Sequence, residues 1–581
     1  MEEIINDQSS SPALSNKVKK AKVVFVALDA RFTHSNPAIR SILNYVRANV
    51  HNSELPELIF LEHNINQSKE LILNKICDCQ ADACFFSCYI WNIELIKRIV
   101  ADLKQVQPDL LIGLGGPEVA YSPEASLRHN EGVDLISTAE GELPYSLLLP
   151  RLFEYKAQGQ YPVAGFAWLD KQGNFRSVPA PEELPLDQLP FLYPDGLGHL
   201  EHRYVYYESS RGCPFNCSYC LSSLDHTLRL RDLDLVKAEL RYFMEQGVPL
   251  VKFIDRSFNA DPRRAREIWR FLIKHTKERL AKDKDLASAY ETYLQKKQTF
   301  PPFTRFHFEI EARLLEQADF ELLAEAPQGL FQFEVGIQSF DPRVLRAVNR
   351  SPETADILRA LQCLAEQGRI HCHADLIFGL PEQDMDSIAR SFRLILSSRA
   401  EQIQLGFLKV LKGTSMAVDA ARRGFIWERE APYEVLATDL ITYQELRELK
   451  HLESVYERFS SEGVFRHSRN LILTFNQSLA EKDAACLGLR LPRLAQETDA
   501  QASSWDSFDF FLRAGKYFYS HGLLDRSLSR DEFFSRFYDF VLDYGEEEEG
   551  LLASAIRRDY EALPRGNLAS WERLRQKYPG K

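Results

Sequence analysis

Three closely spaced cysteines are the residues of this sequence best suited to carry chemistry. They lie in the run Arg211-Gly-Cys-Pro-Phe-Asn-Cys-Ser-Tyr-Cys220, which has the spacing CxxxCxxC. Thiolates are soft ligands that suit iron–sulfur clusters, and three of them can bind three irons of a [4Fe–4S] cube. The remaining iron then has no protein ligand and can bind a small molecule. We therefore predict a catalytic cluster with Cys213, Cys217 and Cys220 as its metal ligands.

A structural zinc site is the alternative interpretation of the same cysteines. Zinc in such sites usually has four ligands, with cysteines in CxxC-type pairs. His226 is the only neighbouring residue available as a fourth ligand. The spacing therefore favours the iron–sulfur cluster.

Further motifs follow the cysteines, and together they resemble the radical S-adenosylmethionine (SAM) enzymes. In that family an aromatic residue stands at the position of Tyr219, and the open iron chelates the amino and carboxylate groups of SAM and splits it reductively to a 5′-deoxyadenosyl radical. The resemblance implies that the SAM-binding residues are Asp255, Glu309, Glu311, Gln338, Arg350 and Asp375. Each carboxylate taken alone has an equally good alternative as an ion-pair partner at a strand end.

Two glycine-containing loops precede the cysteines. Gly113-Leu-Gly-Gly-Pro-Glu118 and Ala139-Glu-Gly-Glu142 each follow a strand-like run, and glycine lets backbone approach a bulky ligand closely. Their order before a radical SAM motif resembles the cobalamin-binding domain of cobalamin-dependent radical SAM enzymes, over about residues 20 to 420. The resemblance implies a cobalamin site lined by Gly115, Gly116, Pro117, Glu140, Gly141 and Glu142.

One motif of other cobalamin-binding proteins is missing from the sequence. A D-x-H-x-x-G motif supplies a histidine to the lower face of cobalamin in those proteins, but Asp29 and His34 are five apart and Glu62-His63 has no Asp at position 61. We expect base-off cobalamin without a histidine ligand, with His34 and His63 as polar loop residues. Cys84 and Cys88 lie in an apolar run, where cysteine behaves as a small hydrophobic residue.

The elements that must position these residues alternate between strands and helices, which indicates the α/β class. Short apolar runs at 22–28, 57–61, 83–89, 110–114 and 133–136, separated by helical stretches, predict a doubly wound parallel sheet. A second series of strands at 204–208, 250–254, 306–310, 330–337, 373–377 and 402–409 predicts a partial (β/α)6 TIM-like barrel. The insert 274–302 is charged and predicts a solvated helical extension.

The predicted domains follow from these two series. They are a flexible tail at 1–20, the cobalamin-binding domain at 21–155, a proline-rich linker at 156–203 with a short hairpin around Gly173, the radical SAM barrel at 204–425 and a mainly helical C-terminal domain at 426–581. In the last, an apolar stripe predicts core packing. Its members are Leu436, Leu440, Leu449, Leu452, Tyr456 and Phe459. Glu546 to Glu549 are expected on a solvated face.

Composition limits the classes of partner. The formal charge of the 581 residues is −12, which argues against a dedicated nucleic-acid surface because such surfaces need clustered Lys and Arg. The first twenty residues lack the apolar core of a signal peptide, and no run approaches the ~18 apolar residues of a membrane span. Ten cysteines without a disulfide framework favour a reducing cytoplasm.

The family resemblance implies a cobalamin-dependent radical SAM enzyme that functionalises an unactivated carbon, with methyl transfer as the commonest outcome. Its cofactors would be a [4Fe–4S] cluster, SAM and cobalamin, its substrate a small molecule or peptide, and its electron donor a protein such as flavodoxin or ferredoxin. Radical oxidative cyclisation or rearrangement is an alternative. A tRNA methylthiotransferase-like enzyme is disfavoured by the acidic charge and the helical C-terminus, and a non-enzymatic corrinoid sensor is disfavoured by the three cluster cysteines.

Overall fold

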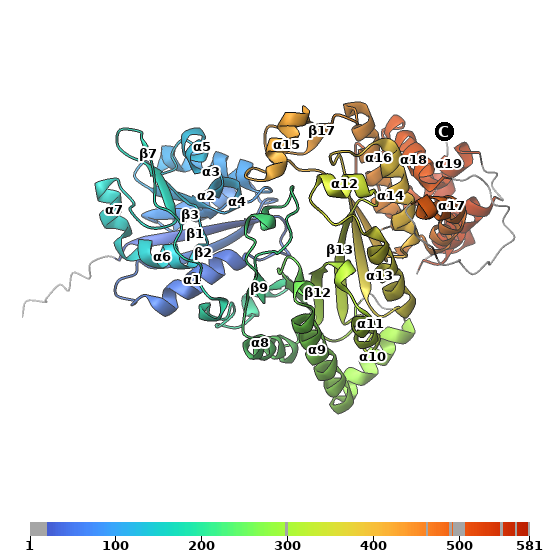
Figure 1. Ribbon diagram of the computed structural model, residues 1–581, viewed down its shortest axis with the longest axis horizontal. Coiled ribbons are helices and arrows are strands. Elements are labelled where there is room, and N and C mark those ends of the chain that lie inside the picture. The colour runs from blue at the N-terminus through green and yellow to red at the C-terminus, as the bar shows by residue number, and fades with distance from the viewer. Residues whose placement is uncertain are drawn as a thin grey trace, which may run out of the picture. The chain divides into compact units, whose positions relative to one another are not determined.

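The computed structural model describes residues 20–296, 300–460, 463–486, 491, 506–545, 550–563 and 566–578. The chain divides into two compact units, and each of them contains one main β-sheet with helices packed on it (Figure 1). The first unit is formed by Met1–Phe32 and Ala38–Glu182, and the second by Thr33–Pro37 and Glu183–Lys581.

The first unit contains a seven-stranded sheet in the order β2-β1-β3-β4-β5-β6-β7. The parallel strands are β1 (Lys22–Asp29), β2 (Glu57–Asn64), β3 (Ala83–Ser87), β4 (Leu111–Gly115) and β5 (Leu135–Ser137). The helices are α1 (Pro37–Asn49), α2 (Lys69–Asp78), α3 (Ile93–Val106), α4 (Pro117–Ala120), α5 (Pro123–His129), α6 (Glu142–Leu148) and α7 (Leu152–Gln158). The strand order reverses between β1 and β3, where ligands bind in sheets of this kind. The predicted doubly wound sheet is confirmed.

A short hairpin extends this sheet beyond its parallel part. Strands β6 (Phe166–Leu169) and β7 (Phe175–Ser177) pair antiparallel, and β6 pairs antiparallel with β5. Gly173 in the connecting turn has a φ of +79°, a conformation that glycine adopts without strain. The first unit therefore continues to Glu182, past the limit at residue 155 that we predicted.

The second unit contains a six-stranded parallel sheet in the order β8-β11-β12-β13-β14-β15. Its strands are β8 (Val205–Tyr207), β11 (Leu250–Phe253), β12 (Arg305–Ile310), β13 (Phe331–Gln338), β14 (His371–Phe378) and β15 (Gln402–Phe407). The intervening helices include α8 (Leu233–Glu245), α9 (Pro262–Lys282), α11 (Gln317–Ala324), α12 (Pro342–Ala347), α13 (Thr354–Gln367) and α14 (Met385–Ser397). Two short antiparallel pairs, β9 (Ser210–Arg211) with β10 (Arg229–Leu230) and β16 (Ile426–Trp427) with β17 (Val435–Ala437), accompany the sheet, and α15 (Ser415–Arg423) follows β15.

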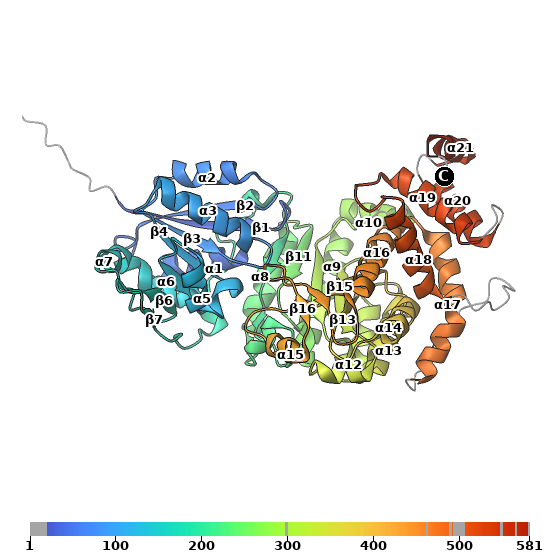
Figure 2. The same cartoon turned by 90° about the horizontal axis from the view of Figure 1, so that it is seen from above.

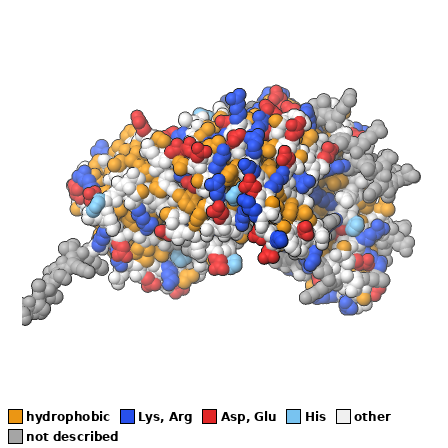
Figure 3. Space-filling view, turned by 90° about the horizontal axis from the view of Figure 1, so that it is seen from below, with side chains coloured by type: hydrophobic (Ala, Val, Ile, Leu, Met, Phe, Trp, Pro, Cys, Tyr) orange, Lys and Arg blue, Asp and Glu red, His pale blue; other side chains and the backbone are white. Residues whose placement is uncertain are grey.

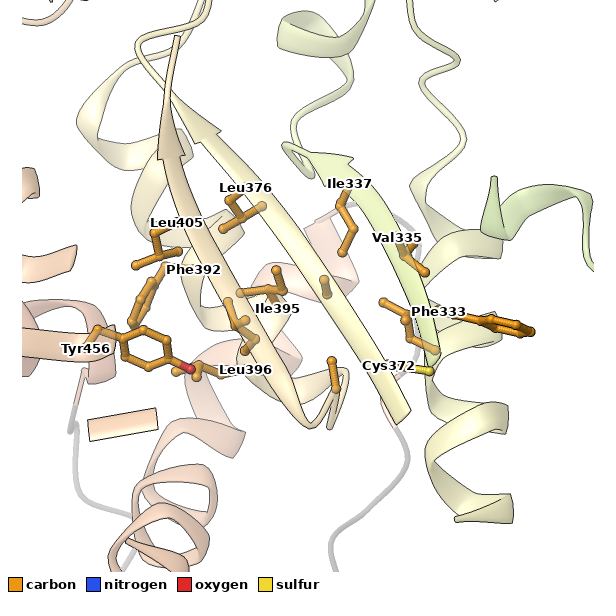
Figure 4. Packing of buried hydrophobic residues seen from close by; sticks show 14 of the residues in the cluster. Phe333, Val335, Ile337, Cys372, Leu376, Phe392, Ile395, Leu396, Leu405 and Tyr456 are labelled. Atoms are coloured by element: carbon orange, nitrogen blue, oxygen red, sulfur yellow. The ribbon is translucent and has the colours of Figure 1, made fainter. Parts of the chain in front are cut away.

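Alternation along the strands separates an apolar side of this sheet from a polar side. Along β13, Phe331, Phe333, Val335 and Ile337 are buried, and the residues between them are partly exposed. Figure 4 shows the last three of these together with Cys372, Leu376 and Leu405 from the neighbouring strands and with Phe392, Ile395 and Leu396 of α14. Side chains alternate with a period of two, so Gln332, Glu334 and Gln338 point to the other side, into the lumen of the partial barrel.

The charged insert predicted at 274–302 begins within α9 and continues into a second helix. Helix α9 extends to Lys282, with Thr276 buried, and α10 (Lys284–Lys296) follows with no buried residue. The predicted solvated helical extension is confirmed for α10, and residues 297–299 lie outside the described residues.

Helices make up the C-terminal part of the second unit. They are α16 (Tyr443–Ser460), α17 (Arg466–Cys486), α18 (Ser507–Ser520), α19 (Arg530–Asp543), α20 (Leu551–Glu561) and α21 (Leu568–Lys577). Figures 1 and 2 both show α16, α17 and α18 near α14. No helix in the described part of the chain has the length and apolar character needed to cross a membrane.

The predicted apolar stripe is correct for its last four members only. Leu449, Leu452, Tyr456 and Phe459 are buried on α16. Leu436 lies in β17, and Leu440 is 49% exposed. The helix begins only at Tyr443. The backbone N–H of Thr442 donates a hydrogen bond to the Glu445 carboxylate at 2.8 Å, and this capping contact fixes the start of the helix there. Glu546 to Glu549 lie outside the described residues.

We predict that Gly515→Val destabilises the helical part of the second unit. A Cβ at Gly515 of α18 would lie 2.7 Å from the backbone of His451 and Leu452 in α16, so the two helices would have to move apart. We expect the free energy of unfolding to fall by about 1–3 kcal/mol, measured by urea denaturation. Arg513→Ala, on the exposed side of α18, is the control and should change it little. Equal effects of the two variants would contradict the close approach of α16 and α18.

Candidate active site

The cysteine loop is held in place by its own backbone. Gly212 has a φ of +89°, and a side chain there would collide with the carbonyl of Thr227. The Cys213 N–H donates to the Asp225 carbonyl at 3.0 Å, and the Ser223 hydroxyl contacts the carbonyls of Cys217 and Cys220 at 2.8 and 2.6 Å. The three sulfur atoms are not needed for these bonds. They remain available as ligands.

The three thiols influence one another electrostatically. Burial raises the pKa of Cys217, the Arg350 guanidinium lowers it, and Cys220 and Cys213 raise it again. No group of three or more His, Cys, Asp and Glu side chains in the described residues is arranged to hold a single metal ion. The ligands of a cube bind different irons and need not converge on one point, whereas those of zinc must. A cluster therefore does not require the three thiols to converge on one point.

Arg350 links the cysteine loop to two strands of the sheet. Its guanidinium lies 3.6 Å from Cys217 Sγ and 3.5 Å from the Tyr219 hydroxyl. It also donates to the Gly336 carbonyl at 2.8 Å and to the Glu311 carboxylate at 3.3 Å. The structure thus brings together Arg350, Glu311 and the cysteine loop, which are far apart in the sequence. A cation beside a thiolate ligand offsets negative charge that a cluster would bring.

Asp255 is held by the segment that leads into the cysteine loop. The carboxylate is 1% exposed and accepts hydrogen bonds from the Ser209 N–H at 2.8 Å and from the Ser209 and Ser210 hydroxyls at 2.6 Å each. Burial raises its pKa to about 6, and these hydrogen bonds oppose the shift. The structure therefore gives Asp255 a positioning contact with residues just before Arg211. The SAM contact that we predicted for it stays a prediction.

Carboxylates form a layer inside the lumen. Burial raises the pKa of Glu309 to about 7, an effect that Arg256 opposes from 3.7 Å and Glu334 increases. Glu334 is hydrogen-bonded to His307 at 3.0 Å, which lowers its pKa. Burial, with Glu334 and Glu309 nearby, raises the pKa of Asp375 to about 8. At neutral pH this layer holds at least one proton.

Glu334 and His307 are lumen residues that the sequence analysis missed. Both lie at alternate positions of predicted strands, two residues before Gly336 and Glu309 respectively. Period-two alternation along β12 and β13 is the signal that could have found them.

Two of the predicted SAM-binding residues have buried acceptor atoms to offer a ligand. Gln338 Oε1 and Asp375 Oδ1 are buried without a hydrogen-bond partner among the described residues. Gln338 also has a φ of +69° beside an irregularity in the pairing of β13 with β14, and such strained positions occur at functional sites. SAM carries three kinds of hydrogen-bond donor: the ammonium group of its methionyl part, the amino group of its adenine and the hydroxyls of its ribose. The lumen therefore fits SAM.

In the first unit, the predicted cobalamin loops lie together at the carboxyl edge of the sheet. Gly115 ends β4, Pro117 begins α4, Gly141 precedes α6 and Glu142 begins it. Glu140 lies in the short loop before Gly141. Strands β4 and β5 are neighbours, so both loops occupy adjacent positions.

The glycines of these loops are required by protein contacts. Gly116 has a φ of +105°, and a Cβ there would lie 2.5 Å from the Cys88 carbonyl. A Cβ at Gly141 would collide with the Ile42 side chain. Glu142 is 4% exposed and accepts a hydrogen bond from the Ser41 hydroxyl at 2.7 Å. A substitution at Gly116 would therefore disturb the fold before it could report on a ligand.

Exposed aromatic rings at the same edge fit a flat apolar cofactor such as the corrin of cobalamin. Phe32, Trp91 and Tyr121 follow β1, β3 and α4, and are 55%, 43% and 43% exposed. The Trp91 ring stacks on Tyr89 with centroids 4.4 Å apart, and its N–H donates to the Leu28 carbonyl at 3.1 Å. Large exposed rings in one region commonly mark a binding surface. The sequence analysis did not identify them, because single exposed aromatics have no motif.

The two histidines considered as cobalt ligands have protein partners. His63 Nδ1 lies 3.0 Å from Gln67 Oε1 in the first unit. His34 groups with the second unit, where its Nδ1 lies 2.5 Å from the Tyr206 hydroxyl. His34 lies in a loop, as expected, whereas His63 lies within β2, so the loop position expected for His63 is wrong. Cys84 and Cys88 are fully buried, which raises the pKa of both thiols.

Comparison with known families matches three parts of the chain. Residues 207–395 match the radical SAM superfamily, residues 8–149 match the B12 binding domain, and residues 422–480 match a protein of unknown function (DUF4080). The first two matches contain the cysteine loop and the glycine loops respectively.

Curated relatives include two methyltransferases. The 2-(S-pantetheinyl)-carbapenam-3-carboxylate methyltransferase of Streptantibioticus cattleyicolor is 26% identical over 54% of this chain, and the match spans 44% of that relative. An uncharacterized methyltransferase of Pyrococcus horikoshii is 22% identical over 64% of this chain and 73% of its own. The chain thus spans less than half the length of the first relative.

Solved structures with the same fold include two enzymes. The cobalamin-dependent S-adenosylmethionine radical enzyme OxsB, with aqua-cobalamin and S-adenosylmethionine bound, gives a TM-score of 0.57 at 13% identity, over 95% of this chain and 85% of that one. The radical S-adenosylmethionine methyltransferase TsrM from Kitasatospora setae, with cobalamin and a [4Fe-4S] cluster bound, gives a TM-score of 0.53 at 16% identity, over 71% of this chain and 80% of that one. At these identities the likeness concerns the fold.

We predict that Asp375→Asn changes how stability depends on pH. The pKa of Asp375 is raised from 3.8 to about 8 in the fold, so the folded chain binds its proton more tightly than the unfolded chain. Its stabilising contribution is complete below 3.8 and is lost as pH rises towards about 8. Asparagine cannot ionise. The variant should therefore gain stability relative to the unsubstituted chain over this range, by more than about 1 kcal/mol.

Urea denaturation at about pH 4.5 and about pH 8 measures this difference. Asp285→Asn, which removes an exposed carboxylate of α10, is the control and should show no such change with pH. A stability difference for Asp375→Asn that stayed constant between the two pH values would contradict the raised pKa.

Proposed function

Because the chain belongs to the cobalamin-binding radical SAM enzymes, we propose that it transfers a methyl group to an unactivated carbon of a small-molecule or peptide substrate. The observation that carries the proposal is the B12 binding domain followed by a radical SAM domain, in a chain whose curated relatives include methyltransferases. When bound, the cluster and SAM supply hydrogen abstraction and cobalamin supplies the methyl group.

Each cofactor has a group of residues that would hold it. Cys213, Cys217 and Cys220 would ligate the cluster. The Arg350 guanidinium, which lies 3.6 Å from Cys217 Sγ, would offset the negative charge of the cluster. Gln338 Oε1 and Asp375 Oδ1 would accept hydrogen bonds from SAM. Cobalamin would lie at the carboxyl edge of the first sheet, against the Gly115-Gly116-Pro117 and Glu140-Gly141-Glu142 loops and the rings of Trp91 and Tyr121.

The lumen carboxylates have a role in holding protons. Asp375, with a pKa of about 8, is protonated at neutral pH and can both donate and accept one hydrogen bond. Glu309, with a pKa of about 7, changes its protonation state easily near neutrality. The two groups can therefore adjust to a ligand of either charge without leaving a buried charge unpaired.

We further propose that the enzyme works in the cytoplasm with a reducing protein such as flavodoxin or ferredoxin as electron donor. All ten cysteines are free, and a reduced cluster needs an electron source. The helical region after residue 425 is assigned to substrate selection, since it follows the barrel and carries none of the proposed cofactor ligands.

The cluster assignment predicts the behaviour of cysteine variants. After anaerobic reconstitution the chain should contain about four irons and absorb near ~400 nm, and on reduction it should convert SAM slowly to 5′-deoxyadenosine. Changing Cys213, Cys217 and Cys220 together to Ala should abolish all three signals, because no ligands for the cluster remain.

Cys77→Ala is the matched control and should retain iron and SAM cleavage. If the triple variant kept its iron, the cluster would lie elsewhere. If it lost iron and the unsubstituted chain still made no 5′-deoxyadenosine, the ligands would be right and the proposed reaction wrong.

The cobalamin assignment predicts that Trp91→Ala weakens corrinoid binding about tenfold, or ~1.4 kcal/mol, because an exposed ring is lost from the carboxyl edge. Equilibrium dialysis with hydroxocobalamin measures the affinity. Val106→Ala, which shortens an exposed side chain at the far end of α3, is the control.

Paramagnetic resonance of the cob(II)alamin form tests the lower face in the same samples. Cobalt lines without nitrogen splitting are expected, because the sequence lacks the D-x-H-x-x-G motif that supplies a histidine to the lower face. Splitting that disappeared in His63→Ala would show that this histidine binds cobalt. A chain that bound no corrinoid would contradict the proposed role of the first unit.

A further inference from the structure

A large cavity lies at the amino-terminal end of the barrel, away from the cysteine loop. Its volume is about 950 Å³, within the range of small-molecule sites. Residues just before β8, the loop between α8 and β11, and the first residues of β11 and β12 form its wall. The cysteine loop, Arg350 and Gln338 lie at the opposite, carboxyl ends of the strands. The cavity is therefore separate from the proposed cofactor sites.

Two cations of the described residues line this cavity without a carboxylate within the 4 Å of an ion pair. The Arg305 guanidinium lies over the Phe300 ring at 4.1 Å, and the Lys252 ammonium lies over the Tyr204 ring at 5.2 Å. Neither side chain forms a hydrogen bond or an ion pair with the described residues, and all four residues line the cavity. Burial lowers the pKa of Arg305. A partly buried cation without a partner is costly, and an anion would offset that cost.

The outer surface of the same unit shows the opposite behaviour. Figure 3 views the side on which α8 and α9 lie in Figure 1, and Lys and Arg side chains are frequent in its middle. Three of the cations on α9 form ion pairs: Arg266 with Asp319, Arg270 with Glu267 and Lys277 with Glu325. Arg305 and Lys252 in the cavity differ from these three, because no carboxylate of the described residues forms an ion pair with them.

The rest of the cavity wall does not supply the missing anion. Glu201 is the acidic residue among those described in the wall, and its side chain is 81% exposed and lies 3.8 Å from His202. His373 has its pKa lowered to about 4 by burial, so it is neutral, and Gln332 Nε2 lies 3.1 Å from His373 Nε2. The wall combines cations, neutral polar groups and aromatic rings.

We propose that this cavity binds an organic anion, a carboxylate or phosphate attached to a flat apolar body. The anionic group would pair with Arg305 and Lys252, since charge-assisted hydrogen bonds are stronger than neutral ones. The apolar body would contact the Tyr204 and Phe300 rings. The proposal concerns binding alone and does not depend on the proposed reaction.

The layering of charge in the lumen fixes which way such a ligand lies. Lys252 is in electrostatic range of Glu309 and Glu334, which stand one step nearer the carboxyl ends of their strands than His307 and Gln332. An anion is attracted to the amino-terminal layer and repelled by the carboxylates above it. The charged end of the ligand therefore stays at the amino-terminal mouth.

Binding of naphthalene probes to the full-length, cluster-reconstituted chain tests the proposal. Isothermal titration would compare 1-naphthyl phosphate and 1-naphthoate with neutral 1-naphthol and cationic 1-naphthylmethylamine. We expect at least one anion to bind about tenfold more tightly than 1-naphthol, and the amine to bind least. The tighter of the two anions identifies the preferred acid group. Equal affinity of all four probes, or no binding, would overturn the proposal.

Substitutions locate the site. Arg305→Gln and Lys252→Gln should each weaken binding of the preferred anion about tenfold and leave the affinity for 1-naphthol unchanged. Lys252→Arg should retain binding of the anion. Arg241→Gln is the control, because Arg241 also lies over a phenylalanine ring, Phe271 at 5.5 Å, but outside the cavity. Thermal unfolding shows that each variant is folded. Anion binding unaffected by either Gln variant would place the probe elsewhere and refute the site.

Discussion

The guanidinium of Arg350 connects the cysteine loop to the ends of two neighbouring strands. It contacts Cys217 and Tyr219 of the cysteine loop, Glu311 after β12 and the Gly336 carbonyl in β13. Each of these groups is a hydrogen-bond acceptor in a partly buried place, and one rigid planar donor satisfies all of them. Lysine could not reproduce this fork. The position of the thiols relative to the lumen therefore depends on a residue far from them in sequence.

Much of the fold follows from simple patterns in the sequence. The buried parallel strands of the first sheet read as short continuous apolar runs, and those of the second sheet alternate between apolar and polar residues. For these reasons the strands of both sheets lie close to their predicted positions. The start of α16 did not follow, because the capping contact between Thr442 and Glu445 cuts the helix off from Leu436 and Leu440. Apolar periodicity alone cannot show where a cap will form.

The sequence predicts which residues belong to the site better than it predicts the contacts that these residues make. The cysteine spacing and the order of strand-end motifs locate the lumen, but Asp255 turned out to bond Ser209 and Ser210, a pairing that only the fold reveals. Glu334, Trp91 and the pair Arg305 and Lys252 were missed for the same reason. Their environment is created by neighbouring strands, and a single sequence carries no record of strand pairing.

The hairpin of β6 and β7 has a consequence for how the protein behaves in a crowded solution. A sheet that ended at β5 would expose unpaired N–H and C=O groups to other chains, and such edges promote aggregation. Strand β7 has only three residues, and its central Arg176 is exposed and paired with Asp170 at 2.9 Å. An edge so short and so charged is a poor template for another strand. The hairpin thus protects the sheet from self-association.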